Sequence, residues 1–187
     1  MTSQRKRFLA PLVVIFLLTS VFWVFFKIPI YQYIFLILGL GLGAFFLDFD
    51  HIVYWLYLNP NVEESRLARL AIFKYDIRSV IKLIDATENQ HTSLIFHHFF
   101  FQVVISIISV FVFTSSDNIF AKAFLLAINI HLLSHEFYDF KHRKQHLQDW
   151  LFARESKQLP TAYLDKYIAI FSILSGIFFI LLLRSAT

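Results

Sequence analysis

The sequence contains no cysteine, which excludes disulfide bonds and thiolate-bound metal sites. A metal ion would therefore have to be held by His, Asp, Glu or carbonyl oxygens. Charged residues are scarce, at 16% of the chain against about 25% in a typical soluble domain, while hydrophobic residues reach 58%. With a mean hydropathy of +0.63, this composition predicts an integral membrane protein.

The hydrophobic residues lie in five long blocks. A helix needs about 20 apolar residues to cross a hydrocarbon core about 30 Å thick. The first block lacks the small-x-small cleavage site of a signal peptide, so we interpret it as an uncleaved anchor. Residues 1–187 thus predict one all-α integral membrane domain, a polytopic bundle of about five transmembrane helices. These helices are expected at about residues 8–26, 30–47, 94–113, 119–135 and 165–183.

The segment between the second and third blocks has a different character, because apolar residues recur at helical spacing with basic residues on the other faces. This pattern predicts an amphipathic helix over about residues 62–85. We expect one or two such helices on the cytoplasmic side. It either lies on a leaflet with anionic headgroups or is a solvated helix docked on the rest of the protein. The sequence leaves both interpretations open.

Three glycines, Gly39, Gly41 and Gly43, lie in the second block. Gly39 and Gly43 are four residues apart on one helix face, which is the small-residue spacing that lets membrane helices approach closely. The alternative is that the glycines are merely tolerated in a membrane helix. The sequence does not separate these two interpretations.

Basic residues predict the orientation. If the N-terminus is cytoplasmic and five helices alternate, all of the 17 basic residues except Lys27, Lys122 and Arg184 fall on the cytoplasmic side. This asymmetry follows the positive-inside rule and predicts a multi-pass protein of the inner (cytoplasmic) membrane. It also accounts for the net charge of +4 without a nucleic-acid partner.

Ionisable residues form three clusters at the ends of these blocks, and the alternating topology places all three at one membrane depth. Such groups cost about 2.5–3.5 kcal/mol each within a membrane helix and are usually functional. A single interfacial His or Asp is more often a headgroup-level or capping residue, so the signal is the coincidence of three clusters. They are Asp48, Asp50 and His51; His91, His97 and His98; and His131, His135, Glu136 and Asp139.

Spacing within the clusters favours metal binding. His131, His135 and Asp139 follow one another at four-residue steps, so they share one helical stripe. Two groups at this spacing bind one divalent ion in helical zinc sites. Asp48 and His51, three residues apart, also share a face. In the second cluster, geometry does not choose between His97 and His98, and we take His97 as the candidate.

We therefore predict a site for a divalent metal ion. Eight candidates exceed the needs of one tetrahedral ion, so either two ions bind or some candidates support the ligands. Mixed His and carboxylate ligands favour Zn, Mn or Fe over Mg or Ca. Glu136 or Asp48, if not bound to metal, is the expected catalytic proton acceptor. The candidate metal ligands are Asp48, Asp50, His51, His91, His97, His131, His135 and Asp139.

Short motifs carry a family resemblance. Residues 47–51 (Leu-Asp-Phe-Asp-His) resemble the Pro-Asp-x-Asp-His motif of the membrane-bound metal-dependent hydrolases of the LexA-binding, inner-membrane-associated type. Residues 134–139 (Ser-His-Glu-Phe-Tyr-Asp) are similar to their Ser-His-x-x-x-Asp motif. Residues 91–98 keep histidines where the family has His-Arg-x-x-Thr-His-Ser, but the spacing differs and the Arg is missing. Leu47 also stands where the family has proline.

The resemblance covers roughly residues 39–139 and implies a metal-dependent hydrolase. His-x-x-x-Asp is also similar to a ligand pair of zinc-dependent phospholipases C, which suggests a lipid or another phosphoester as substrate. The basic segment 66–82 and the run 141–144 are then expected to hold an anionic headgroup. The oligomeric state stays open.

Two other functions compete with this hypothesis. One is a membrane di-iron oxidase of the desaturase type, because His131/His135 and His142/His146 look like histidine boxes, although Leu94 stands where a full box needs His. We expect His142 and His146 to lie in a solvated basic loop instead. The other is a non-enzymatic, metal-stabilised scaffold or partner-binding protein, whose metal site would be closed.

Overall fold

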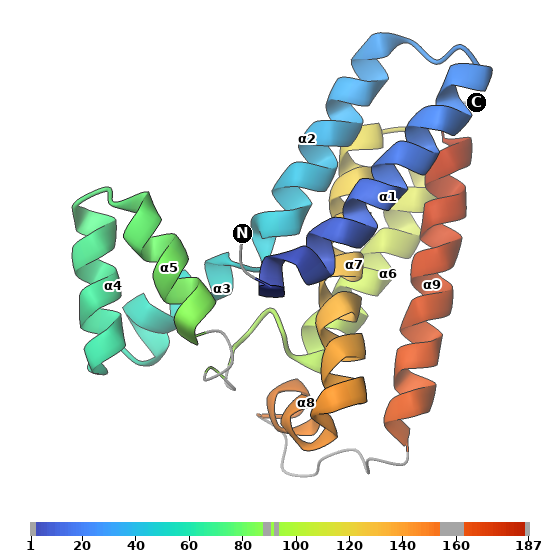
Figure 1. Cartoon of the computed structure of the whole chain (residues 1–187). Helices are drawn as coiled ribbons and strands as arrows, with labels where there is room; N and C mark the ends of the chain where they lie inside the picture. The colour runs from blue at the N-terminus through green and yellow to red at the C-terminus, as the bar shows by residue number, and fades with distance from the viewer. Residues whose placement is uncertain (1–2, 88–90, 92–93, 154–162, 186–187) are drawn as a thin grey trace.

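The computed structural model describes residues 3–87, 91, 94–153 and 163–185, and the regular secondary structure in these ranges is helical (Figure 1). The predicted all-α class is confirmed. Residues 154–162 lie outside the described ranges, and they include part of the predicted cytoplasmic loop. The elements are α1 (Ser3–Phe25), α2 (Ile30–Phe46), α3 (Phe49–Val53), the π-helix η1 (Tyr54–Leu58), α4 (Glu63–Phe73), α5 (Ile77–Thr87), α6 (Phe99–Ser115), α7 (Ile119–His142), α8 (Lys144–Leu151) and α9 (Leu164–Arg184).

Among the residues that the structure describes, four stretches are long and apolar enough to cross a membrane, so the chain is a membrane helix bundle. They are Arg7–Phe25, Ile30–Leu58, Ile119–His142 and Leu164–Arg184. Helix α6 is apolar but has only 17 residues. The five expected membrane helices therefore correspond to four full-length spans and one shorter helix that packs against α7 and α9.

Helix α7 is the centre of the bundle. It contacts α1, α2, α6, α8 and α9. Of its membrane-spanning window 67% is buried inside the protein, against 28–33% for the other three spans. Residues of α7 are therefore the ones that the fold can bring into contact with most other elements.

Two glycines allow α2 to lie directly against α7. A Cβ atom at Gly39 would lie 2.6 Å from the carbonyl oxygen of Phe120 and 2.7 Å from the Cβ of Ala123. A Cβ at Gly43 would lie 2.7 Å from the Cβ of Ala127 and would also meet the carbonyl oxygen of Phe124. The small-residue interpretation of this pair is confirmed.

The second membrane segment continues past its expected end at residue 47. A turn at Leu47 and Asp48 separates α2 from α3, and the helical path then runs on through η1 to Leu58. The residues after Asp48 are largely apolar and aromatic, so they extend the helix. The path ends before Pro60, which disfavours a helical conformation at the residue preceding it.

The single helix expected over residues 62–85 is instead a helical hairpin, α4 and α5, and that prediction was wrong. Tyr75 adopts a left-handed conformation, with φ of 54°, and ends the run. Asp76 then caps α5, because its carboxylate accepts hydrogen bonds from the N–H (3.1 Å) and the hydroxyl (2.7 Å) of Ser79. These hydrogen bonds lower the pKa of Asp76. The apolar period continues across the turn, so periodicity alone could not reveal the break.

The third and fourth membrane helices differ from their predicted bounds. Helix α6 begins at Phe99 rather than at residue 94, and α7 continues to His142 rather than ending at residue 135. His98 caps α6 by accepting a hydrogen bond from the N–H of Phe100 at 3.3 Å. The last helix agrees with its predicted bounds to within one residue at each end.

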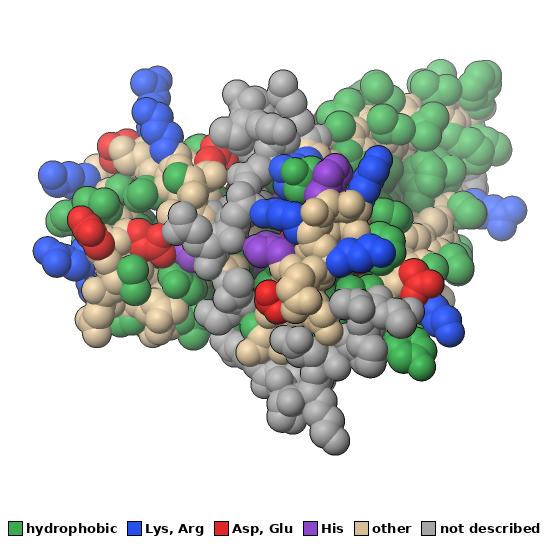
Figure 2. Space-filling view, turned by 60° about the horizontal axis from the view of Figure 1, so that its bottom comes forward, with side chains coloured by type: hydrophobic (Ala, Val, Ile, Leu, Met, Phe, Trp, Pro, Cys, Tyr) green, Lys and Arg blue, Asp and Glu red, His purple; other side chains and the backbone are tan. Residues whose placement is uncertain are grey.

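The two ends of the bundle are chemically different. At one end the last turn of α9 meets α1 and α7, because Trp23 donates to the carbonyl of Leu183 (3.1 Å) and Lys122 donates to the hydroxyl of Ser185 (2.8 Å). At the other end lie α8 and the α4–α5 hairpin, which stands beside the bundle (Figure 1). Figure 2 shows charged and histidine side chains gathered over this second end, whereas the adjoining flank of the bundle is largely hydrophobic.

Candidate metal centre

Five histidines from three distant parts of the chain form one cluster. His51 comes from α3, His91 and His97 from the non-helical segment before α6, and His131 and His135 from α7. Neighbouring rings have centroid separations of 4.9 to 6.4 Å. The fold thus brings all three sequence clusters together, and we call these five residues the histidine cluster.

Four rings of the cluster are buried, His135 is partly buried, and the cluster contains two close imidazole pairs. The Nδ1 atoms of His51 and His91 are 2.8 Å apart, and the Nε2 atoms of His131 and His135 are 3.2 Å apart. His51 and His131 are each 2% exposed, and His91 is 3% exposed. His97 lies between the pairs, with ring centroids 6.3 Å from His51 and 6.0 Å from His135.

Three of the five rings have one nitrogen bonded to an oxygen acceptor. His131 Nδ1 is 2.7 Å from the carbonyl oxygen of Ala44, and His91 Nε2 is 2.7 Å from Glu64 Oε1. His97 Nδ1 is 3.3 Å from Asp50 Oδ2. A carbonyl or carboxylate oxygen only accepts, so these nitrogens carry the proton and the other nitrogen of each neutral ring carries a lone pair.

For two of these rings the lone pair faces another imidazole of the cluster. His131 presents Nε2 to His135, and His91 presents Nδ1 to His51. Metal-ligating histidines almost always donate their second ring N–H to a carbonyl or a carboxylate in this way. His131 and His91 therefore each have the proton placement of a metal-ligating histidine.

Asp50 holds the third segment in place. Its side chain is fully buried and accepts hydrogen bonds from the N–H groups of Ile95 (2.9 Å) and Phe96 (2.5 Å) as well as from His97. These bonds explain why residues 94–98 are not helical, contrary to the predicted start of the third helix. Asp50 thus positions His97 in the cluster.

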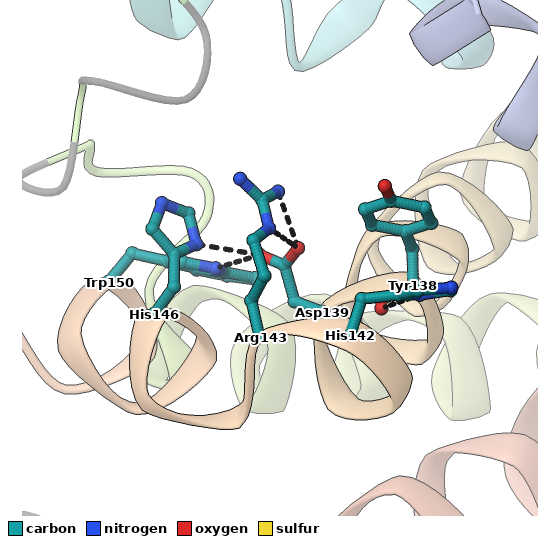
Figure 3. A network of polar contacts seen from close by, with 6 residues as sticks. All are labelled: Tyr138, Asp139, His142, Arg143, His146 and Trp150. Carbon is teal, nitrogen blue, oxygen red and sulfur yellow. Dashed lines mark hydrogen bonds and ion pairs between the residues drawn. The ribbon is translucent and has the colours of Figure 1, made fainter.

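Asp139 lies in a network of its own (Figure 3). Its carboxylate accepts from Arg143 at 2.6 and 3.1 Å, from His146 Nδ1 at 2.8 Å and from Trp150 Nε1 at 3.0 Å. Asp139, His146 and Trp150 share the lining of a 30 Å³ cavity with His97 and His135. Asp139 therefore borders the histidine cluster, while its hydrogen bonds tie the end of α7 to α8.

The expectation that both His142 and His146 are solvated was half wrong. His142 is exposed, and its Nδ1 contacts the carbonyl oxygen of Tyr138 at 2.8 Å. The side chain of His146 is only 25% exposed and lies against Asp139. Hydrogen bonds from His146 and Trp150 to Asp139 hold α8 against the end of α7, and this places His146 at the cavity.

Glu136 faces another part of the bundle. It is fully buried and accepts a hydrogen bond from Gln102 Nε2 at 3.2 Å, and the hydroxyl of Tyr167 donates to the oxygen of the same Gln102 amide. This network joins α7 to α6 and α9. Asp48 lies partly buried in the turn between α2 and α3, and the hydrogen bonds that orient His97 and its segment are made by Asp50.

The structure also adds residues that the sequence did not identify. Tyr54 stacks on His91 with ring centroids 3.9 Å apart, and Phe8 stacks on His131 at 3.8 Å. Glu64 orients His91 across a separation of 27 residues, which no local pattern reveals. The sequence suggested His146 only as part of a histidine box. Its position seven residues after Asp139 is the helical spacing that could have placed it beside that carboxylate.

Within the part of the chain that the structure describes, no group of three or more His, Asp and Glu side chains already has the arrangement of a metal site. The donor chemistry nevertheless fits a divalent ion. Two nitrogens on one tetrahedral zinc ion would lie about 3.3–3.4 Å apart, given Zn–N distances of about 2.0–2.1 Å. The His131–His135 separation of 3.2 Å is close to this distance, whereas the His51–His91 separation of 2.8 Å is that of a hydrogen bond and would have to widen around an ion.

Comparison of the chain with protein-family models, with curated proteins and with solved structures finds no match. Function therefore has to be argued from the site itself.

Proposed function

We propose that this protein is a membrane-embedded, metal-dependent hydrolase whose site is the histidine cluster. The observation that carries the proposal is the proton arrangement, in which Ala44, Glu64 and Asp50 each hold one ring nitrogen of a histidine. Four buried imidazoles and a fifth that is partly buried would be costly in a membrane protein without such a role. The motif resemblance at residues 47–51 and 134–139 supports the same function.

The His131–His135 pair and the His51–His91 pair are the proposed ligands of one or two ions, with His97 between them. Imidazole ligands with nearby carboxylates favour Zn²⁺, with Mn²⁺ or Fe²⁺ as alternatives. The bound ion supplies Lewis acidity, which polarises an ester or phosphoryl oxygen and acidifies a water molecule. Asp50 and Glu64 hold His97 and His91 in the required orientation.

The cavity beside the cluster suggests which residue accepts a proton. His146 lines this cavity together with His97 and His135, and its Nδ1–H donates to Asp139 at 2.8 Å. A carboxylate that orients a histidine base is a recurring catalytic arrangement. We therefore propose His146 as general base in preference to Glu136, which contacts Gln102. The alternative role of Asp48 as catalytic proton acceptor stays a prediction.

The bilayer is the proposed partner of the basic, polar end. On the α4–α5 hairpin, the side chains of Phe73, Tyr75 and Ile77 are 76%, 89% and 69% exposed. Lys74 lies beside them in the turn. Exposed apolar and basic side chains together favour binding to a leaflet with anionic headgroups. We further propose that this end faces the cytoplasm in the inner membrane.

Hydrolysis by the purified protein tests the proposed function. In detergent micelles containing a fluorogenic ester or phosphodiester lipid, we expect turnover that is lost on chelation and restored by Zn²⁺, Mn²⁺ or Fe²⁺. His146→Gln should reduce kcat by about 10²–10⁴-fold, while His142→Gln, at an exposed position, should not. Turnover that is insensitive to chelation, or equal in both variants, would contradict the proposal.

A metal-stabilised scaffold is the second candidate, because Asp139 ties α7 to α8 through Arg143, His146 and Trp150. Asp139→Asn separates the two functions. For a hydrolase, we expect this variant to stay folded and keep its metal while losing turnover. In a scaffold, Asp139→Asn should instead unfold the protein, and the wild type should have no turnover to lose. The di-iron alternative is less supported, because His142 of its second box is exposed.

A further inference from the structure

An apolar groove runs between α1 and α2 on the outside of the bundle. Its volume is 320 Å³, and every residue lining it is apolar or glycine. Leu9 and Phe16 line it on α1, and Ile37 and Phe45 line it on α2. Small-molecule sites typically have volumes of about 300–1,000 Å³, so the groove is large enough for a narrow ligand.

One glycine gives the groove its open space. A Cβ atom at Gly41 would meet no heavy atom within 4 Å. Unlike Gly39 and Gly43, which allow α2 to approach α7, Gly41 therefore has no packing partner that requires a glycine. Because Gly41 lines the groove, the missing side chain leaves it open there.

One end of the groove, at Ala44 and Phe45, adjoins the candidate metal centre, although no histidine lines the groove itself. Ala44 lines the groove, and its carbonyl oxygen is the acceptor for His131 at 2.7 Å. Phe8, which precedes the groove residue Leu9, stacks on His131 and lies edge-on against Phe45 with centroids 6.3 Å apart. A ligand lying in the groove would therefore have one end beside the histidine cluster.

The position of the groove in the membrane indicates its occupant. Both flanking helices are membrane spans, and the lining residues Val13 and Ile37 are 54% and 52% exposed. Hydrocarbon chains are the solvent of such a surface. A helix about 10–12 Å wide would rest on the two flanking helices, whereas a single chain fits the space left by one absent side chain.

We propose that this groove binds one acyl chain of a membrane lipid and presents the lipid's ester or phosphoester to the histidine cluster. The substrate class is then an acylated lipid rather than a soluble ester. This inference rests on the proposed function only for the fate of the bound lipid, because the groove itself is formed by α1 and α2.

Photolabelling tests the groove directly. The full-length protein is reconstituted in vesicles that contain phosphatidylglycerol with a diazirine in the middle of one acyl chain. We expect saturable labelling of α1 and α2 groove residues, which Gly41→Phe abolishes. Gly176→Phe is the matched control, because Gly176 in α9 also has no heavy atom within 4 Å of a built Cβ and does not line the groove.

Labelling of the groove that rises in proportion to lipid without saturating would overturn the inference, as would saturable labelling that survives Gly41→Phe. Protection of the groove by a second copy of the chain would also overturn it. The experiment requires neither metal nor turnover. If the groove is not labelled as expected, the hydrolase proposal still stands. If the groove is labelled as expected but the protein contains no metal, the hydrolase proposal fails and the groove proposal stands.

Discussion

At the scale of single residues, Asp50 links the backbone to the chemistry of the cluster. It holds the N–H groups of Ile95 and Phe96, which keeps this segment out of α6, and it orients His97. A buried carboxylate with three donors is well satisfied, so its removal is costly in two ways. The segment loses its anchor, and His97 loses its orientation.

Asp50→Asn should therefore weaken metal binding. We expect affinity to fall by about 10–100-fold, which is typical for the loss of a partner that orients a ligand. Competition with a fluorescent chelator in detergent measures the change, and the melting temperature verifies folding. Asp48→Asn is the comparison, and a larger loss in that variant would identify Asp48, rather than Asp50, as the critical acid.

Residue spacing predicted part of this site and not the rest. The four-residue step from His131 to His135 places two imidazoles in contact, as observed. The next step, to Asp139, was expected to extend the same ligand stripe, but Arg143 and His146 bind that carboxylate once α8 folds back. Tertiary partners decide which way a side chain points, and spacing alone does not reveal them.

At the scale of the elements, the contact between α2 and α7 depends on the absence of two side chains. Gly39→Ala and Gly43→Ala each put a Cβ within 2.7 Å of a facing alanine Cβ on α7. We expect each to destabilise the protein by about 1–3 kcal/mol, the usual cost of overpacking. Gly41→Ala should change stability by less than about 0.5 kcal/mol or improve it.

Unfolding in a graded series of denaturing detergent measures these differences. Equal gains in all three glycine variants would show that helix propensity, rather than packing against α7, governs stability.

The α4–α5 hairpin offers a test of pH dependence. Hydrogen bonds from Ser79 lower the pKa of Asp76 in the folded hairpin. The cap therefore contributes its full stability above the ordinary carboxyl pKa of about 3.9 and loses it as pH falls through the lower folded value. Hydrogen exchange at the first turn of α5, corrected for intrinsic rates, should show protection falling with acidification. In Asp76→Asn this pH dependence should vanish, and its persistence would argue against the cap.

At the scale of the whole molecule, the chain separates a polar end from an apolar belt. Composition and the length of the apolar blocks were enough to predict this arrangement. They could not predict the hairpin, because the turn at Tyr75 interrupts a continuous apolar pattern, nor the contact between Glu64 and His91, which joins the hairpin to the cluster. Such long-range contacts appear only when the complete chain is folded.

The proposed orientation predicts which side of the membrane each end occupies. Because the chain has no cysteine, single-cysteine variants need no background substitutions. We expect a membrane-impermeant maleimide added from the outside to label Lys27→Cys, and to label Arg78→Cys only after the membrane is opened. Both positions are exposed. The opposite labelling pattern would reverse the orientation.

The central claim is that histidines from three segments bind a shared divalent ion. Elemental analysis of the detergent-purified protein tests it most directly, with His51→Ala, His135→Ala and His142→Ala as variants. We predict one or two bound ions per wild-type chain, a loss of metal in His51→Ala and His135→Ala, and full retention in His142→Ala, where the side chain is exposed. A metal-free wild type, or metal content that is the same in all four proteins, would contradict the claim.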